Sequence, residues 1–330
     1  MKRVYAIVCL LLLSLLLFSG CGSAEPDGKQ LRIAYFPNIT HSQALVMKEQ
    51  ASLEAALGED CSLSWTAFNA GPAEVEAMFA GEIDLGFIGP VPAISANVKS
   101  QGDFVVIAGA SNGGAALVIR NELDFRSVAD LSGKVVAIPQ LGNTQHLSLL
   151  NLLSENGLSP KSEGGNVEVV AAGNADILNM MDQGSIDAAL VPEPWASTIL
   201  AQTDSRLAME YDEIWMGGNY STAVVIVSKD FLEESPEIVS TFLEVHKATT
   251  QFIQENPEAA AEMANRQIEA ETGKLIEESI LQSAFERLRI TYALPEESLE
   301  AFAQLSYDEG FISALPDEGL CHEDALEALE

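Results

Sequence analysis

Basic residues are scarce in this chain of 330 amino acids, which has 17 lysines and arginines against 49 aspartates and glutamates. The net charge of −32 would repel a phosphate backbone at long range, so nucleic acid is excluded as a partner. Because 48% of the residues are hydrophobic and only 20% are charged, the chain is not a disordered acidic tail. Its length allows one large domain or two of ordinary size, with a substantial buried core.

Cysteine and histidine are also rare, with four of each. The histidines share no metal-ligand spacing with one another or with the cysteines, so we expect neither a metal nor a cofactor. The cysteines are Cys9, Cys21, Cys61 and Cys321. They imply no disulfide framework, and the sequence leaves open whether Cys61 and Cys321 pair.

Long apolar runs are absent as well. The run at 4–18 has 15 residues, short of the roughly 20 that a membrane-spanning helix needs, and it follows Lys2 and Arg3 as the core of a signal peptide does. It ends in small residues before Cys21, a pattern that resembles the bacterial lipoprotein signal, in which the cysteine receives a lipid and cleavage occurs just before it.

We therefore predict a signal peptide at 1–20 and a flexible, lipid-anchored tether at 21–30. This places the protein at the cell membrane, on its extracytoplasmic face. An ordinary signal peptide that happens to end beside a cysteine is the alternative.

From residue 31 onward, short apolar runs alternate with segments of helical period, which predicts an α/β fold with largely parallel sheets. The predicted strands are 31–35, 64–68, 85–88, 104–108, 135–138, 167–170 and 188–191. The predicted helices are 42–57, 72–80, 91–99, 144–156 and 175–183, and the chain after 235 is helical and acidic almost to its end.

Part of the first series of elements recurs in the second. Gly81-x-Ile83-Asp84 before one strand matches Gly184-x-Ile186-Asp187 before another. The separation from Ala34 to Asp84 is 50 residues, as is that from Ala137 to Asp187. Matching strands at matching offsets indicate two similar α/β lobes.

The two lobes are not simply consecutive, because extended apolar segments at 117–120 and 222–228 flank the second series. We interpret these segments as two crossings between the lobes. Lobe 1 then comprises 31–116 and 229–330, and lobe 2 comprises 117–228 with both crossing segments. Since ligands bind beyond the carboxyl ends of strands in open α/β sheets, the cleft between the lobes is the expected site.

The loops at these strand ends carry amides, hydroxyls and glycines, with Glu193 as their only carboxylate and no lysine or arginine. Backbone N–H groups at the helix starts there could hold an anionic oxygen without a cation. Helix capping, surface positions and, for Trp195, a place in the hydrophobic core are the alternative roles for these residues. The candidate ligand-binding residues are Asn38, Thr40, His41, Asn69, Gly89, Pro90, Ser111, Asn112, Gly142, Asn143, Thr144, His146, Glu193, Trp195 and Tyr220.

One enzyme motif needs consideration. Residues 109–113 match the Gly-x-Ser-x-Gly pattern of a nucleophile elbow, with Ser111 as the nucleophile. An elbow requires a strand, a sharp turn and then a helix, whereas 114–120 is expected to be extended. We therefore expect the protein not to be an enzyme.

Several segments together resemble the substrate-binding lipoproteins of ABC importers of the nitrate, sulfonate and taurine type. They are Ile-Ala-Tyr-Phe-Pro-Asn-Ile-Thr-His at 33–41, Phe-Asn-Ala-Gly-Pro at 68–72, and the segments 80–92, 137–145 and 191–196. The resemblance implies a two-lobed, type II periplasmic-binding-protein fold that closes on a small anionic or zwitterionic ligand. It also implies delivery of that ligand to an ABC permease driven by its ATPase, and we expect a monomer.

The segment 142–146, Gly-Asn-Thr-Gln-His, resembles the Gly-Ser-Ser-x-His run of the family's sulfonate binders. The resemblance implies an aliphatic sulfonate or taurine, with sulfonate oxygens on the turns at Gly89 and 142–144. Trp195 would then lie near the alkyl part and Glu193 near an ammonium group. Nitrate, bicarbonate and thiamine-type pyrimidines are alternative ligands, and an enzyme of the same fold is an alternative of another class.

More than half of the negative excess falls within 231–330, which leaves the cleft loops nearly neutral. Raising the salt concentration should therefore leave the association rate of an anionic ligand unchanged or increase it, because salt screens repulsion. Stopped-flow mixing with ethanesulfonate at several salt concentrations measures this rate. A steep fall with salt would show that the ligand enters through a basic region instead.

Overall fold

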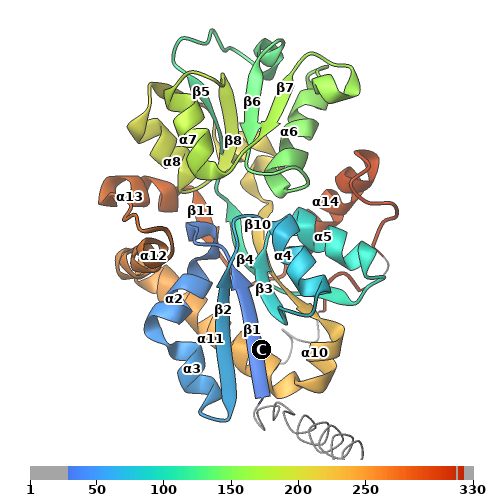
Figure 1. The fold of residues 1–330 in the computed structure, drawn as a ribbon, viewed down its shortest axis with the longest axis vertical. Helices are drawn as coiled ribbons and strands as arrows, with labels where there is room; N and C mark the ends of the chain where they lie inside the picture. Colours follow the sequence, from blue (N-terminus) through green and yellow to red (C-terminus); the bar gives the residue numbers. More distant parts are fainter. Residues whose placement is uncertain (1–28, 317–318, 323–330) are drawn as a thin grey trace, which may run out of the picture.

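The computed structural model describes residues 29–316 and 319–322, and Figure 1 shows two α/β lobes, one above the other. The predicted two-lobed α/β fold is thereby confirmed. The predicted signal peptide, Cys21 and the tether up to residue 28 lie outside the described residues, and Lys29 and Gln30 begin the first strand. Among the described residues, no helix is long and apolar enough to cross a membrane.

Lobe 1 contains a six-stranded sheet in the order β11-β4-β10-β3-β1-β2. β1 pairs in parallel with β2 and β3, whereas β10 runs antiparallel to β3 and β4, and β11 runs antiparallel to β4. The strands are β1 (Lys29–Tyr35), β2 (Cys61–Ala67), β3 (Leu85–Ile88), β4 (Phe104–Gly113), β10 (Ser221–Ser228) and β11 (Leu288–Ile290).

Lobe 2 contains a five-stranded sheet in the order β7-β6-β8-β5-β9, with β6 parallel to β7 and β8, and β5 antiparallel to β8 and β9. The order β7-β6-β8-β5-β9 of lobe 2 therefore repeats β2-β1-β3-β10-β4 of lobe 1, strand for strand, with the same parallel and antiparallel pairs. This agrees with the two similar lobes that the internal repeat predicted. Both sheets are mixed, so the expectation of largely parallel sheets was wrong. The strands are β5 (Ala115–Arg120), β6 (Val135–Ile138), β7 (Glu168–Ala171), β8 (Ala188–Pro192) and β9 (Ser205–Met209).

Helices cover both faces of each sheet. In lobe 1, one core layer involves α2 (Ser42–Gln50), α3 (Ser52–Leu57), α11 (Pro236–Glu255) and α12 (Pro257–Thr272). The other involves α4 (Gly71–Phe79), α5 (Pro90–Lys99) and α14 (Glu296–Asp308). The predicted helix at 42–57 is therefore two helices, which meet at Ala51 with a φ of 49°.

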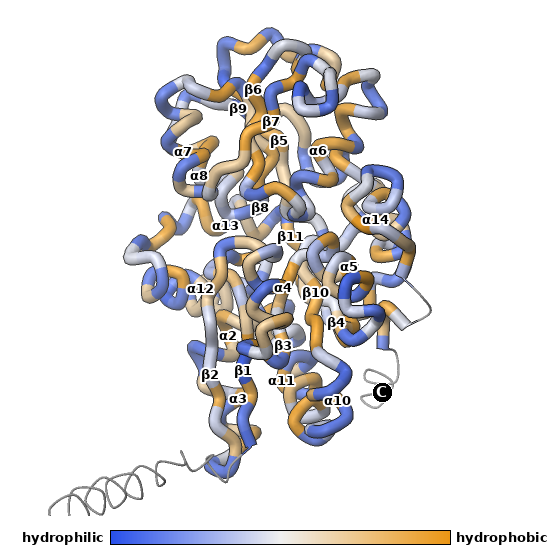
Figure 2. The backbone as a smooth tube through the Cα atoms, turned by 45° about the vertical axis from the view of Figure 1, so that its right-hand side comes forward, coloured by the Kyte–Doolittle hydropathy of each residue, from blue (hydrophilic) through white to orange (hydrophobic). Residues whose placement is uncertain are grey.

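In lobe 2, α6 (Thr144–Glu155) covers one face, and α7 (Asn174–Asp182) and α8 (Trp195–Gln202) cover the other. The hydrophobic segments lie mainly inside the lobes, as the colouring of β5, β10 and α6 in Figure 2 shows. The remaining helices are short, apart from α13: α9 (Tyr211–Ile214), α10 (Lys229–Glu234), α13 (Glu278–Glu286), η1 (Ile39–His41), η2 (Val128–Leu131), η3 (Lys161–Glu163) and η4 (Met216–Gly218).

The repeated aspartates have the same role in both lobes. The Asp84 carboxylate accepts a hydrogen bond from the Arg32 backbone N–H at 2.8 Å, and the Asp187 carboxylate accepts one from the Val135 N–H at 2.9 Å. The two residues of each pair are 52 positions apart. Each aspartate directly precedes a strand, β3 or β8, and therefore joins the start of that strand to the central strand beside it.

The chain passes from the first sheet to the second at Gly113 and Gly114, which both have a φ of 72°. It returns between the end of β9 and the start of β10. The predicted boundary needs one correction: 222–228 was placed in lobe 2, but β10 pairs with β3 and β4 in the sheet of lobe 1. Apolar character alone does not show which sheet a strand joins.

An ion-pair network joins the two lobes beside these crossings. Arg287, which precedes β11, donates to the carboxylate of Glu193 at 3.2 Å and to that of Glu210 at 2.7 and 3.0 Å. Glu193 follows β8 and Glu210 follows β9, so both acids belong to lobe 2. The Glu193 side chain is fully buried and also accepts from the N–H and the hydroxyl of Ser197. Burial raises the pKa of Glu193, while Ser197 and Arg287 oppose that rise.

Replacing Arg287 with alanine should lower the free energy of unfolding by about 3 kcal/mol at pH 7, because it leaves the buried Glu193 carboxylate without its cation. The loss should shrink as the pH falls, since a protonated Glu193 carries no charge to compensate. Urea unfolding followed by circular dichroism measures both effects.

The control is Arg126→Ala, which removes an exposed ion pair to Asp130 and should cost less than about 1 kcal/mol. Equal costs for the two variants would contradict a stabilising role for the Arg287 network.

Candidate functional site

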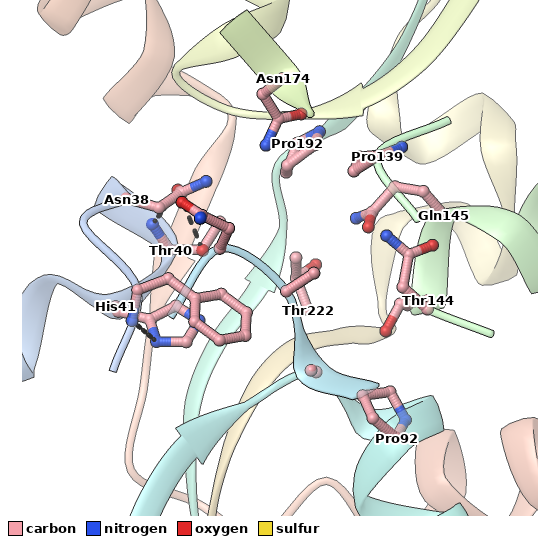
Figure 3. Close-up of a pocket in the computed structure, with 16 residues that line it drawn as sticks. Asn38, Thr40, His41, Pro92, Pro139, Thr144, Gln145, Asn174, Pro192 and Thr222 are labelled. Carbon is pink, nitrogen blue, oxygen red and sulfur yellow. Dashed lines mark hydrogen bonds between the residues drawn. The ribbon is translucent and has the colours of Figure 1, made fainter. Parts of the chain in front are cut away.

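A cavity of about 40 Å³ lies between the lobes, at the carboxyl ends of the central parallel strands. In Figure 3 the labelled side chains come from both lobes and surround a common space. Given the volume that one buried water occupies, the cavity has room for roughly three waters. It therefore accommodates a compact polar group. Its lining comprises Phe36, Asn38, Thr40, His41, Asn69, Ala70, Gly71, Gly89, Pro92, Pro139, Asn143, Thr144, Gln145, Asn174, Pro192 and Thr222.

Four α-helices begin at this cavity. α4 starts at Gly71, α5 follows Gly89, α6 starts at Thr144 and α7 starts at Asn174, and all four of these residues line the cavity. A helix N-terminus carries a partial positive charge and N–H groups without intrahelical acceptors. The four starts therefore direct backbone N–H groups and the positive ends of helix dipoles towards the cavity, and no lysine or arginine is among its lining residues in the described chain.

The start of α6 offers the most suitable donors. Asn143 is its N-cap, and the Asn143 side chain accepts from the N–H of His146 at 2.8 Å. The N–H groups of Thr144 and Gln145 precede that bond in the first turn and have no acceptor within the helix. Both residues line the cavity, so two adjacent backbone donors are available to an anion there.

Two histidines fix the loops of the site. The Nδ1 of His41 accepts from the Phe36 N–H at 3.1 Å, and the Nδ1 of His146 accepts from the Gly142 N–H at 3.1 Å. Burial lowers the pKa of His41 to about 3 and that of His146 to about 4. Both rings are therefore neutral at physiological pH and add no positive charge to the site.

Two polar atoms on the cavity lining have no partner in the described structure. They are the Oγ1 of Thr144 and the Oδ1 of Asn174, and both atoms are buried. Thr144 also meets lobe 1 closely, because a Cβ added to Gly89 would lie 2.6 Å from its Oγ1. Since buried polar atoms are normally hydrogen-bonded, the Thr144 hydroxyl is a candidate ligand contact where the lobes meet.

The lining holds no aspartate or glutamate either, and no cluster of potential metal ligands occurs in 29–316 and 319–322. The acidic excess of the chain therefore does not extend to the site. Cys61 and Cys321 are not joined by a disulfide.

Of the predicted site residues, seven line the cavity: Asn38, Thr40, His41, Asn69, Gly89, Asn143 and Thr144. Other predicted residues do not line the cavity but hold the loops that do. The Ser111 hydroxyl donates to the Thr40 carbonyl at 2.9 Å, and Gly142 and His146 hold the loop before α6. Pro90 is the first residue of α5, and Asn112 lies within β4.

Three predicted contacts lie elsewhere. Glu193 is buried in the network with Arg287 and Ser197, so its carboxylate is already paired. Trp195 is the first residue of α8 and packs on the core of lobe 2, which includes residues of α7 and β8. Tyr220 is 1% exposed and packs with Trp215 and Phe302 in lobe 1.

Several lining residues were not among the predicted ones. Most belong to loops that the sequence did place at the cleft. Except for Gln145, these are apolar or small residues that gave no chemical signal of their own. Asn174 was missed because the start of α7 was not counted among those loops. Thr222, in a segment taken for a crossing between the lobes, was a weaker candidate and was not among the predicted residues. These residues are Phe36, Ala70, Gly71, Pro92, Pro139, Gln145, Asn174, Pro192 and Thr222.

Comparisons with known proteins agree with this architecture. The chain is 29% identical over 195 residues to the taurine-binding periplasmic protein of Escherichia coli, an alignment that covers 58% of each chain. It is 27% identical over 226 residues to a putative aliphatic sulfonates-binding protein of the same organism, covering 68% of this chain and 67% of the relative. Both relatives are described as binding proteins and not as enzymes.

Among solved structures, the alkanesulfonate-binding protein SsuA of Xanthomonas axonopodis pv. citri, bound to MOPS, superposes with a TM-score of 0.74 at 20% identity. The match covers 88% of this chain and 97% of that structure, so the two share one fold. The sequence profile of the NMT1-like family matches residues 24–268. The chain belongs to the NMT1-like family.

Proposed function

We propose that this protein is the extracytoplasmic substrate-binding component of an ABC importer and that it captures a small organic anion. The observation that carries the proposal is the convergence of four helix N-termini on a cavity without charged side chains. Binding of the ligand where the lobes meet would hold them closed, and the closed protein would deliver it to the permease and its ATPase. A lipid on Cys21 would keep the protein at the membrane.

An aliphatic sulfonate suits this cavity best. Its three oxygens would accept from the N–H groups of Thr144 and Gln145, from the Thr144 hydroxyl and from the side-chain NH₂ groups of Asn38 and Asn174. Phe36, Pro92 and Pro192 would surround the first carbons of the alkyl part. The names of the relatives and of the matched structure support the same ligand class.

The position of Glu193 bears on the choice between an alkanesulfonate and taurine. Taurine carries an ammonium group, which would require a carboxylate or several acceptors once it is buried. The carboxylate expected for that role is paired with Arg287, and the lining has no other acid. An ammonium group in the cavity would find only neutral acceptors, such as the unpartnered Asn174 Oδ1, so we propose that an unsubstituted alkanesulfonate binds more tightly than taurine.

A catalytic role has no such support. The segment matching the elbow pattern lies within β4 and continues through Gly114 into β5, without the helix that an elbow needs. The Ser111 hydroxyl donates to the Thr40 carbonyl and has no histidine beside it among its described hydrogen bonds. Binding without turnover is what we propose.

Calorimetric titration with ethanesulfonate, butanesulfonate, taurine, nitrate and bicarbonate tests the ligand class. We expect saturable binding of the sulfonates, with taurine weaker. Thr144→Val should weaken sulfonate binding about 10- to 100-fold, because it removes a hydrogen bond to a charged group. Thr198→Val, which changes a hydroxyl on α8 that bonds the Pro194 carbonyl, is the matched control and should bind as the wild type does. The proposal fails if no member of the panel binds saturably.

Sulfonate affinity should be constant between pH 5 and pH 8. With pKa values of about 3 for His41 and about 4 for His146, both rings stay neutral throughout this range, and a sulfonate does not titrate there. Titrations at four pH values measure this. An affinity that falls as the pH rises through 6 to 7 would instead show that an imidazolium holds the anion.

A further inference from the structure

Glu74 of α4 is a buried acid that the proposed function does not use. Its side chain is fully buried, and both carboxyl oxygens lack a hydrogen-bond partner within the described chain. An ionised carboxylate in such a place would lose its hydration without a compensating bond. Burial therefore raises the pKa of Glu74 well above its ordinary value, which favours the protonated, neutral form in the folded protein.

Gly86 of β3 provides the space for this carboxyl group. A Cβ added to Gly86 would clash with the Oε1 of Glu74, and it would lie 3.2 Å from the Cβ of Ala34 on β1. Gly86 does not have a positive φ, so its backbone conformation does not require a glycine. The absence of a side chain at this position therefore makes room for the acid.

The internal repeat shows what the same position looks like without an acid. In lobe 2, α7 repeats α4 and β8 repeats β3, with equivalent residues 103 positions apart, and Ile177 takes the place of Glu74. Ala189 takes the place of Gly86, and both pair with the neighbouring strand in the same register. Ile177 and Ala189 lie together in one apolar core. The fold itself therefore does not require a carboxyl group at this position.

Glu74 lies behind the lining of the cavity between the lobes. Gly71, one turn earlier on the same face of α4, lines the cavity. On β1, the lining residue Phe36 follows Ala34 by two positions, and both belong to the same core layer. Two strand residues span about 7 Å, so an anion resting on this lining would lie about 10 Å from the Glu74 carboxyl group.

The described elements around Glu74 provide no counter-ion for it. The charged residues of α4, α5, β1, β3 and the turn before β3 are, besides Glu74, Lys29, Arg32, Glu76, Glu82, Asp84 and Lys99. Arg32 and Asp84 are paired with each other, and the other four side chains are exposed. The histidines of the site, His41 and His146, are neutral. An ionised Glu74 would therefore act on the cavity without a neighbouring cation to compensate its charge.

We propose that Glu74 and Gly86 form a proton-binding site behind the cavity, and that the protein binds its anion tightly only while Glu74 holds the proton. This inference rests on the proposed function, because it assumes an anion in the cavity. Neutral Glu74 leaves the positive end of the α4 dipole available to the anion. Loss of the proton to solvent places a like charge about 10 Å from the anion, which at an effective dielectric constant of about 20 weakens binding roughly 15-fold.

Urea unfolding at several pH values tests whether the site holds a proton. The unfolded chain loses the Glu74 proton at the ordinary pKa, whereas the folded protein keeps it to higher pH. Between these two pKa values, the unfolding constant of the wild type should rise by up to about tenfold per pH unit relative to that of Glu74→Gln, which has no proton to lose. The pH at which this difference stops growing is the pH at which the folded protein releases the proton.

Calorimetric titration with ethanesulfonate between pH 5 and pH 10 tests the link to binding. The affinity of the wild type should be constant below the release pH and fall roughly 15-fold above it, whereas Glu74→Gln should keep its affinity throughout. Because the affinity is expected to be constant between pH 5 and pH 8, the fall belongs to higher pH. The matched control is Glu76→Gln, which removes an exposed acid from the same helix and should follow the wild type in both experiments.

A second variant covers the case in which Glu74→Gln does not fold. Glu74→Ile combined with Gly86→Ala reproduces the packing of lobe 2, so it should fold and bind ethanesulfonate with an affinity that does not change with pH. If ethanesulfonate binds but the variants without Glu74 show the same pH dependence as the wild type, in unfolding or in binding, the inference is overturned and the proposed function stands. If no sulfonate binds at any pH, the proposed function fails and the inference fails with it.

Discussion

The alignment of strands and helices at the cleft is the constraint on which the rest of the structure depends. In both sheets the central parallel strands end at the same place, and the helices that follow them begin there. Helix dipoles and free N–H groups therefore point into one cavity from both lobes. The proposed anion would bind at that point although the chain has a net charge of −32, because the N–H donors act at short range while salt screens the distant acidic side chains.

Much of the fold could be predicted because strands, helix caps and repeats depend on short stretches of sequence. The strands Leu85–Ile88 and Val135–Ile138 have the predicted bounds. Both copies of the Gly-x-Ile-Asp repeat proved to have one structural role, in which Asp84 and Asp187 bind backbone N–H groups 52 residues earlier. Capping residues such as Asn143 could also be recognised, because the side chain of a cap bonds a backbone N–H in the next turn of the chain.

The parts that could not be predicted depend on distant partners. Glu193 has the position of a ligand-binding carboxylate, but Arg287 lies 94 residues away and no sequence pattern connects the two. The apolar segment 221–228 joins the sheet of lobe 1 by pairing with strands more than a hundred residues earlier. Trp195 and Tyr220 pack in cores whose other members come from several elements. Tertiary packing decides such cases, and the pairing of Glu193 with Arg287 removes the carboxylate that was expected to hold an ammonium group.

The central claim is that backbone and uncharged donors alone hold the anion. A crystal structure of the protein with butanesulfonate tests it most directly. The account predicts the sulfonate oxygens within hydrogen-bonding distance of the N–H groups of Thr144 and Gln145, with no lysine or arginine in contact with the head group. A sulfonate paired with a lysine or arginine, or bound outside the cavity between the lobes, would contradict the account.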